Sequence, residues 1–130
     1  MRLRALWLCM GWSFVVLVIY LSLTAEPVDL GRIEGVKVGH FIAYGWLMLW
    51  FSQLYRSLGS RAAYGVGFAL MGVALEYAQG MTGYRSFAYS DMGDNVVGVG
   101  MGFALGWTPL GNVLAALEAR VGKIRFRGAA

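Results

Sequence analysis

The chain has 130 residues, of which 58% are hydrophobic and only 14% are charged, compared with about 25% charged residues in an ordinary soluble domain. A mean hydropathy of +0.60 excludes a disordered chain and is high for a soluble domain, which needs a polar surface. The single cysteine, Cys9, and the single histidine, His40, exclude an internal disulfide, a cysteine-based zinc site and a multi-histidine metal site. The length fits one domain over residues 1–130.

Four apolar runs predict four transmembrane helices, at about residues 5–23, 38–55, 62–79 and 91–114. Their apolar parts are long enough to cross about 30 Å of hydrocarbon. A signal peptide is the alternative for the first run, but its apolar core is usually only ~7–15 residues long. We therefore expect an all-α integral membrane protein built as a four-transmembrane-helix bundle.

The fourth run contains Pro109, which removes one helix hydrogen bond and predicts a kink or an end to the helix. Apolar residues recur at helical spacing beyond the proline, which favours a kinked span that continues as an amphipathic helix on the inner surface. Residues 115–130 then form a basic cytoplasmic tail.

The basic residues are distributed unequally between the two sides of this arrangement. Eight of the eleven fall on one side: Arg2, Arg4, Arg56, Arg61, Arg120, Lys123, Arg125 and Arg127. Because Lys and Arg accumulate on the cytoplasmic side, both termini are predicted to be cytoplasmic. The basic residues are split among three short segments beside the membrane, which favours anionic lipid as a partner and argues against nucleic acid.

Polar side chains gather at the opposite, outer ends of the predicted helices. Spacings of three and four residues place several of them on shared helix faces. They are Lys37, His40, Tyr44, Glu76, Gln79, Arg85, Asp91 and Asn95. Ionisable groups within a membrane segment are costly and usually face a protein interior or a cavity, so we expect a polar cluster at the outer leaflet.

Each member of this cluster also has a purely structural interpretation. Asp91 could cap its helix, Lys37 could extend to the lipid headgroups, and Tyr44 could pack or lie at the interface. Gln79 and Asn95 could form hydrogen bonds between helices. Glu76 is harder to explain in this way, because a carboxylate inside an apolar run needs a partner or a proton.

Glycines in the fourth run indicate close helix packing. Gly98 and Gly102 are four residues apart, and such a stripe of small residues lets another helix approach closely. The partner helix could belong to the same chain or to a second copy, so a homo-oligomer remains open.

The polar and glycine positions together resemble the VanZ-like membrane proteins. The matching pieces are Lys37-x-x-His40-x-x-x-Tyr44, Glu76-x-x-Gln79, and Arg85-x5-Asp91-x3-Asn95-x2-Gly98-x3-Gly102. The family often has an aspartate directly before the lysine, where this chain has Val36, so no role of that acid is carried over. The resemblance implies a small multi-pass protein of the bacterial cytoplasmic membrane and a link to low-level teicoplanin (glycopeptide) resistance.

The favoured function is to bind or modify an amphiphilic or lipid-linked envelope substrate at the outer leaflet, the glycopeptide itself being another candidate ligand. Glu76 or His40 would act as general base or acid, with Asp91 as a third catalytic candidate, while Lys37 and Arg85 hold an anionic headgroup. Tyr44, Gln79 and Asn95 would complete the binding site. Whether turnover occurs is left open by the sequence.

Two other functions are ranked lower. A non-catalytic membrane scaffold or partner protein comes second, and a proton-coupled transport module third, because no ionisable group continues the path inward. His40, Glu76 and Asp91 could form a metal-binding set, but the nearby cations favour an organic anion. No metal or cofactor is therefore predicted.

Overall fold

The computed structural model describes residues 1–127, with side chains described as far as Lys123, so the end of the predicted basic tail lies outside the described residues. The helices and strands are α1 (Arg4–Leu23), β1 (Arg32–Ile33), β2 (Val36–Lys37), α2 (Val38–Leu54), α3 (Leu58–Met81), α4 (Tyr89–Leu105), the 3-10 helix η1 (Pro109–Asn112) and α5 (Val113–Arg127). The fold is mainly helical, as the sequence predicts.

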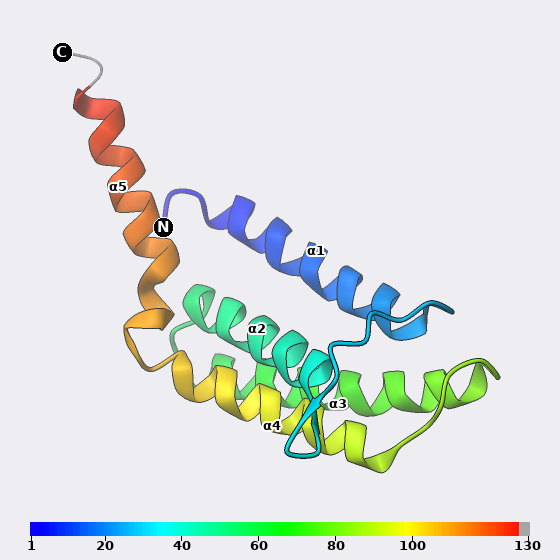
Figure 1. Ribbon diagram of the computed structural model, residues 1–130. Helices are drawn as coiled ribbons and strands as arrows, with labels where there is room; N and C mark the ends of the chain where they lie inside the picture. The colour runs from blue at the N-terminus through cyan, green and yellow to red at the C-terminus, as the bar shows by residue number, and fades with distance from the viewer. Residues whose placement is uncertain (128–130) are drawn as a thin grey trace.

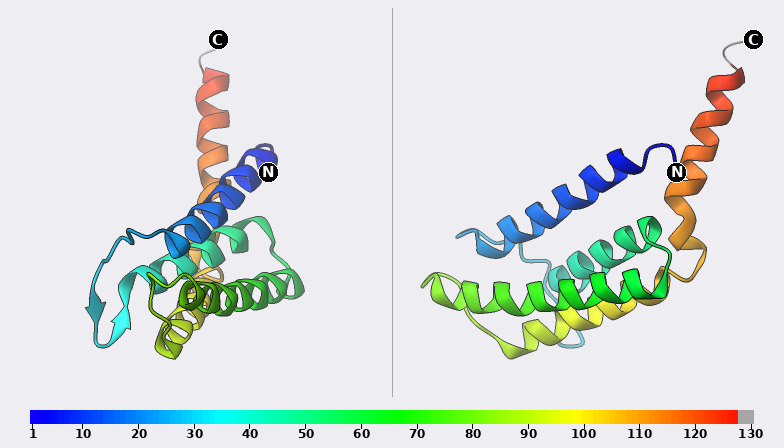
Figure 2. Two further views of the ribbon diagram at one scale, coloured as in Figure 1. Left: turned by 90° about the vertical axis from the view of Figure 1, so that its right-hand side faces the viewer. Right: turned by 180° about the vertical axis from the view of Figure 1, so that it is seen from behind.

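Helices α1 to α4 run back and forth between two ends of the molecule, and α5 projects away from them (Figures 1 and 2). We call the end with the β1–β2 hairpin and the 82–88 loop the hairpin end. The opposite end holds the N-terminus, the α2–α3 turn and the start of α5 (Figure 1). The elements that carry the predicted polar cluster therefore meet near the hairpin end.

Two of the helices, α1 and α3, are long and apolar enough to cross a membrane, and a third crossing results if α4 and residues 109–123 form one bent span. Helix α2 has only 17 residues, but it contains the best-buried apolar side chains among the described residues, Leu47, Met48 and Phe51. Its contacts with α1, α3 and α4 make it the central helix, while α1 leaves large apolar side chains exposed.

The closest helix contact is between α2 and α4, and glycines make it possible. A Cβ atom on Gly102 would collide with the carbonyl oxygen of Gly45 and lie 2.8 Å from Cβ of Met48. A Cβ atom on Gly98 would collide with the carbonyl oxygen of Phe41. Both glycines therefore contact α2 of the same chain. This confirms the prediction that the glycines let a partner helix approach closely.

The fourth helix differs from the expected 91–114 span. It begins two residues earlier, at Tyr89, and ends at Leu105, well before the proline. The chain turns after Gly106, where the side chain of Thr108 accepts a hydrogen bond from the Leu110 amide, and Pro109 begins η1. Proline suits this first position because it has no amide hydrogen to leave unpaired. The helices on either side of the break are bent by 73°, so the expected kink is a complete break.

A basic residue holds the opposite end together. The sequence predicts Arg61 as one of the charges on the cytoplasmic side, but its side chain is buried in α3. Its guanidinium donates to the carbonyl oxygens of Tyr55, at 3.0 Å, and Ser52, at 2.9 Å, and lies over the Trp107 ring. It thus satisfies carbonyl groups left free at the C-terminal end of α2.

Candidate functional site

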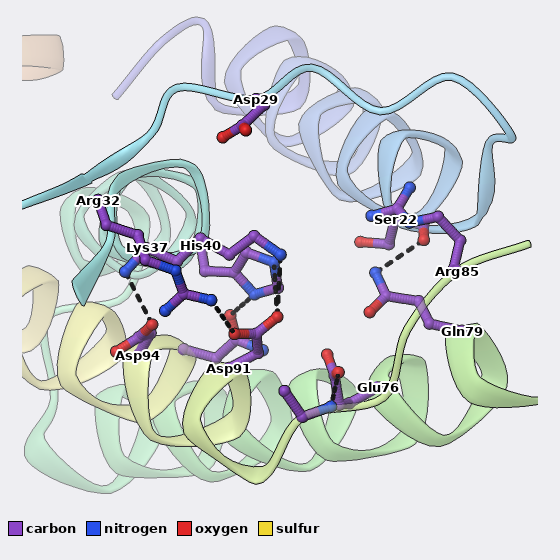
Figure 3. Close-up of polar contacts among 12 residues, drawn as sticks. Ser22, Asp29, Arg32, Lys37, His40, Glu76, Gln79, Arg85, Asp91 and Asp94 are labelled. Carbon is purple, nitrogen blue, oxygen red and sulfur yellow. Dashed lines mark hydrogen bonds and ion pairs between the residues drawn. The ribbon is translucent and has the colours of Figure 1, made fainter. Parts of the chain in front are cut away.

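Asp91 is the centre of the polar cluster at the hairpin end. Its carboxylate accepts from Nζ of Lys37 at 2.9 Å and lies 3.4 Å from Nη2 of Arg32 and 3.8 Å from Nε2 of His40 (Figure 3). The Asp91 side chain is only 3% exposed. A carboxylate buried to this extent needs paired charge and hydrogen bonds, and three cationic or titratable side chains surround this one.

The hairpin supplies two of these contacts. Its turn is formed by Glu34 and Gly35, which have φ angles of 50° and 82°, the pattern of a tight turn in which glycine is favoured at the second position. The hairpin brings Arg32 beside Lys37. The Lys37 amide donates to Oδ2 of Asp94 at 2.8 Å, so backbone as well as side chains attach the hairpin to α4.

His40 is held in a fixed orientation by Asn95. The two side chains are joined by a 2.9 Å hydrogen bond between Nδ1 of His40 and Oδ1 of Asn95. An amide oxygen can only accept, so Nδ1 carries the proton and Nε2 is left facing Asp91. When the ring is neutral, Nε2 has a free lone pair, which is the form needed by a general base or a metal ligand.

Glu76 lies in the same region but lacks a cationic partner. It is 1% exposed, and its Oε1 atom accepts from the backbone amide of Ala88 at 2.8 Å. None of the ion pairs among the described residues involves Glu76. The N-terminus of α4 stabilises a nearby negative charge by about 0.3–1 kcal/mol, whereas burying a lone carboxylate costs several kcal/mol. An ionised Glu76 therefore needs a further positive charge.

Gln79 and Arg85 make a different set of contacts from the rest of the predicted cluster. The Gln79 amide donates to the carbonyl oxygen of Ser22 at 2.7 Å, and Arg85 donates to the carbonyl oxygens of Leu21 and Thr24 at 3.2 and 3.0 Å. Figure 3 shows both side chains on the far side of Glu76 from Asp91. They attach the end of α1 to α3 and the 82–88 loop.

A cavity of about 480 Å³ separates these two groups of contacts. Polar residues line part of it: Ser22, Asp29, Lys37, His40, Tyr44, Gln79, Tyr84, Arg85 and Ser86. Apolar residues line the remainder: Val18, Leu21, Pro27, Val28, Leu30, Ile42 and Ala43, together with Gly39. The lining is therefore amphiphilic. Five of the eight predicted cluster residues line this cavity: Lys37, His40, Tyr44, Gln79 and Arg85.

Two contributors were missing from the sequence prediction. Arg32 and Asp94 were not among the predicted cluster residues, yet both contact the cluster. Strands of two residues are too short to show the alternation of polar and apolar residues that predicts a strand. The signal that could have indicated this hairpin is Gly35, a residue type favoured in tight turns. Asp91 does not cap α4. The N-cap residue of this helix is Ala88, and no side chain makes a capping hydrogen bond there.

One group of side chains has the composition of a metal site. The ligand atoms of His40, Glu76 and Asp91 lie within 4.8 Å of one another. One imidazole and two carboxylates suit a divalent transition-metal ion.

No family model, curated protein sequence or solved structure matches the chain.

Proposed function

We propose that the chain is a VanZ-like, four-span protein of the bacterial cytoplasmic membrane that binds an amphiphile with an anionic headgroup at the outer leaflet. The observation that carries the proposal is the amphiphilic cavity at the hairpin end. Lys37 and His40 are on its polar wall, and apolar side chains of α1 and α2 form another wall. Pockets of roughly 300–1,000 Å³ with a few convergent polar groups are typical ligand sites.

A second, apolar cavity supports an amphiphile in preference to a small polar ligand. It has a volume of about 350 Å³ and lies between α1 and α3, lined by Trp12, Val15, Ala63, Tyr64, Gly67, Phe68 and Met71. Val15, at this cavity, and Val18, at the first one, are three residues apart on α1, about 4.5 Å along the helix axis. An acyl chain whose headgroup occupies the first cavity can therefore extend along α1 to the second.

The proposed topology has four crossings with both termini in the cytoplasm. Counting α2 as a crossing is supported by its position among α1, α3 and α4 and by its ~26 Å length. The distribution of Lys and Arg supports the orientation. The hairpin end, with the cavity, then faces the outer leaflet, where lipid-linked envelope precursors and glycopeptides are accessible.

The proposal is tested by lipid binding to the purified protein. Affinity for phosphatidylglycerol is compared with affinity for phosphatidylcholine of the same acyl chains, in detergent. We expect preference for the anionic lipid and at least about tenfold weaker binding by Lys37→Gln, because a charge-assisted hydrogen bond contributes about 1.5–3 kcal/mol. Lys123→Gln removes one equal charge at the opposite end and should bind like the parent. Equal affinity for both lipids, or equal loss in the two variants, would refute the proposal.

A scaffold function, in which the cluster only fixes helix packing, has one observation in its favour. Gln79 and Arg85 bond to main-chain carbonyl oxygens of α1, which is a structural role. A scaffold predicts that variants of the polar wall lose stability without losing any lipid preference, so melting temperatures are measured on the same samples.

A further inference from the structure

We propose that His40, Glu76 and Asp91 bind one divalent transition-metal ion of the zinc or manganese type. Their ligand atoms already lie within 4.8 Å of one another. Nitrogen and oxygen ligands bind Zn²⁺ at about 2.0–2.2 Å, so bound ligand atoms are roughly 3–4 Å apart. Small side-chain rotations are enough to close the remaining gap.

The orientation of His40 is the second observation that points to an ion. Metal-binding histidines usually donate their other ring hydrogen to a neighbouring acceptor, which fixes the ring and the tautomer. Asn95 provides that acceptor, at 2.9 Å from Nδ1. The remaining nitrogen, Nε2, faces the Asp91 carboxylate (Figure 3), with its lone pair available when the ring is neutral.

The missing charge beside Glu76 is the third observation. This carboxylate is almost fully buried, uses only Oε1 in a hydrogen bond with the Ala88 amide, and has no ion-pair partner among the described residues. A divalent cation supplies the absent positive charge. A proton on Glu76 is the competing explanation, because it removes the buried charge without any ion.

The basic side chains nearby leave room for an ion. Arg32 contacts Oδ1 of Asp91 and Lys37 contacts Oδ2, and each carboxylate oxygen can accept two interactions. The sequence predicts that Arg85 favours an organic anion over a metal, but this side chain donates to the carbonyl oxygens of Leu21 and Thr24 at the end of α1. The cation most expected to compete for Glu76 is therefore engaged elsewhere.

Three protein ligands leave at least one coordination position open for water or an anionic oxygen. His40 also lines the amphiphilic cavity, so a headgroup held there could reach the ion. Only the contact between a headgroup and the ion rests on the proposed function. Ion binding is measured without lipid, and lipid binding can be measured with a chelator present, so the two proposals can fail separately.

The experiment uses the full chain, purified in detergent without a histidine tag and treated with a chelator. Titration with Zn²⁺ by calorimetry should show one ion per chain. His40→Ala, Glu76→Gln and Asp91→Asn should each weaken binding by at least about tenfold, and Asn95→Ala by about 10–100-fold, as expected for loss of an orienting partner. Glu34→Gln removes an exposed carboxylate of the hairpin turn and is the matched control, with unchanged affinity.

A spectroscopic measurement on the parent protein makes the test independent of whether the variants fold. His40 is the only histidine, so spin-echo modulation from an imidazole nitrogen in the Cu²⁺-loaded protein would identify it as a ligand. The absence of saturable Zn²⁺ binding, equal affinity in the parent and the three ligand variants, or a Cu²⁺ signal without imidazole modulation would each overturn the inference.

Discussion

Replacement of Gly102 by alanine tests the close contact between α2 and α4. The added methyl group would collide with the Gly45 carbonyl oxygen and lie 2.8 Å from Cβ of Met48. Because one of these neighbours is backbone, the contact is relieved only by moving the helices apart. Gly100→Ala is the matched control, since a Cβ atom there meets nothing within 4 Å.

The control separates packing from helix propensity. Both substitutions gain up to about 1 kcal/mol of helix propensity, which cancels when the two variants are compared. Overpacking costs about 1–3 kcal/mol, so Gly102→Ala should be less stable than Gly100→Ala by this amount. At roughly 4 °C per kcal/mol for a chain of this size, its melting temperature should be about 4–12 °C lower.

The assay is thermal unfolding of both purified variants in the same detergent, followed by circular dichroism. Gly102→Leu should amplify the effect, because the larger side chain meets the same backbone. If Gly102→Ala and Gly100→Ala melt at the same temperature, or if Gly102→Leu melts like the parent, the helices are not in the contact described and the packing argument is wrong.

Three further predictions concern the ends of the bundle. Glu76→Gln should fold and accumulate like the parent, because the amide keeps the shape and the acceptor for Ala88 while removing the unpaired charge, but it should lose Zn²⁺ binding. A lower melting temperature with Zn²⁺ binding intact would favour the scaffold. Arg61→Ala should lower stability by about 1–3 kcal/mol in thermal melts, because it leaves buried carbonyl groups of α2 unsatisfied; an unchanged melt would contradict this role. In a Cys9→Ala background, a cysteine at Asp29 should react with an impermeant maleimide in intact cells while one at Lys123 should not; the reverse pattern would invert the topology.

Helix positions could be predicted from the sequence because long uncharged runs differ clearly from the short polar segments between them. The end of α4 could not, since Leu110, Val113 and Leu114 continue the apolar pattern across Pro109. Hydropathy alone does not distinguish a continuous helix from two helices joined by a turn. The sequence signal for the break was Pro109, but a proline predicts a kink as readily as a helix end.

The candidate site was predictable only where regular helix spacing determined it. His40 and Asp91 lie in the first turns of α2 and α4, and Asn95 lies one turn further along α4; helix spacing correctly placed Asp91 and Asn95 on one face of α4. Arg85 lies in a loop, where spacing does not specify the direction of a side chain. Arg32 and Asp91 are 59 positions apart in the chain, and their contact depends on the hairpin that carries Arg32.

Helix α1 packs on α2 through side chains such as Trp7 and Phe14, which contact Trp50, but most of its hydrogen bonds to other elements are accepted by its main chain. Trp50 donates to the carbonyl oxygen of Trp7 at one end, and Gln79, Tyr84 and Arg85 donate to carbonyl oxygens at the other. Every residue type has a carbonyl oxygen, so these bonds place little restriction on which side chains α1 carries. In a mutational scan, its exposed positions should therefore accept many apolar residues, whereas intolerance should appear at the donors on α2, α3 and the 82–88 loop. The donors that anchor the main chain of this helix are encoded outside it.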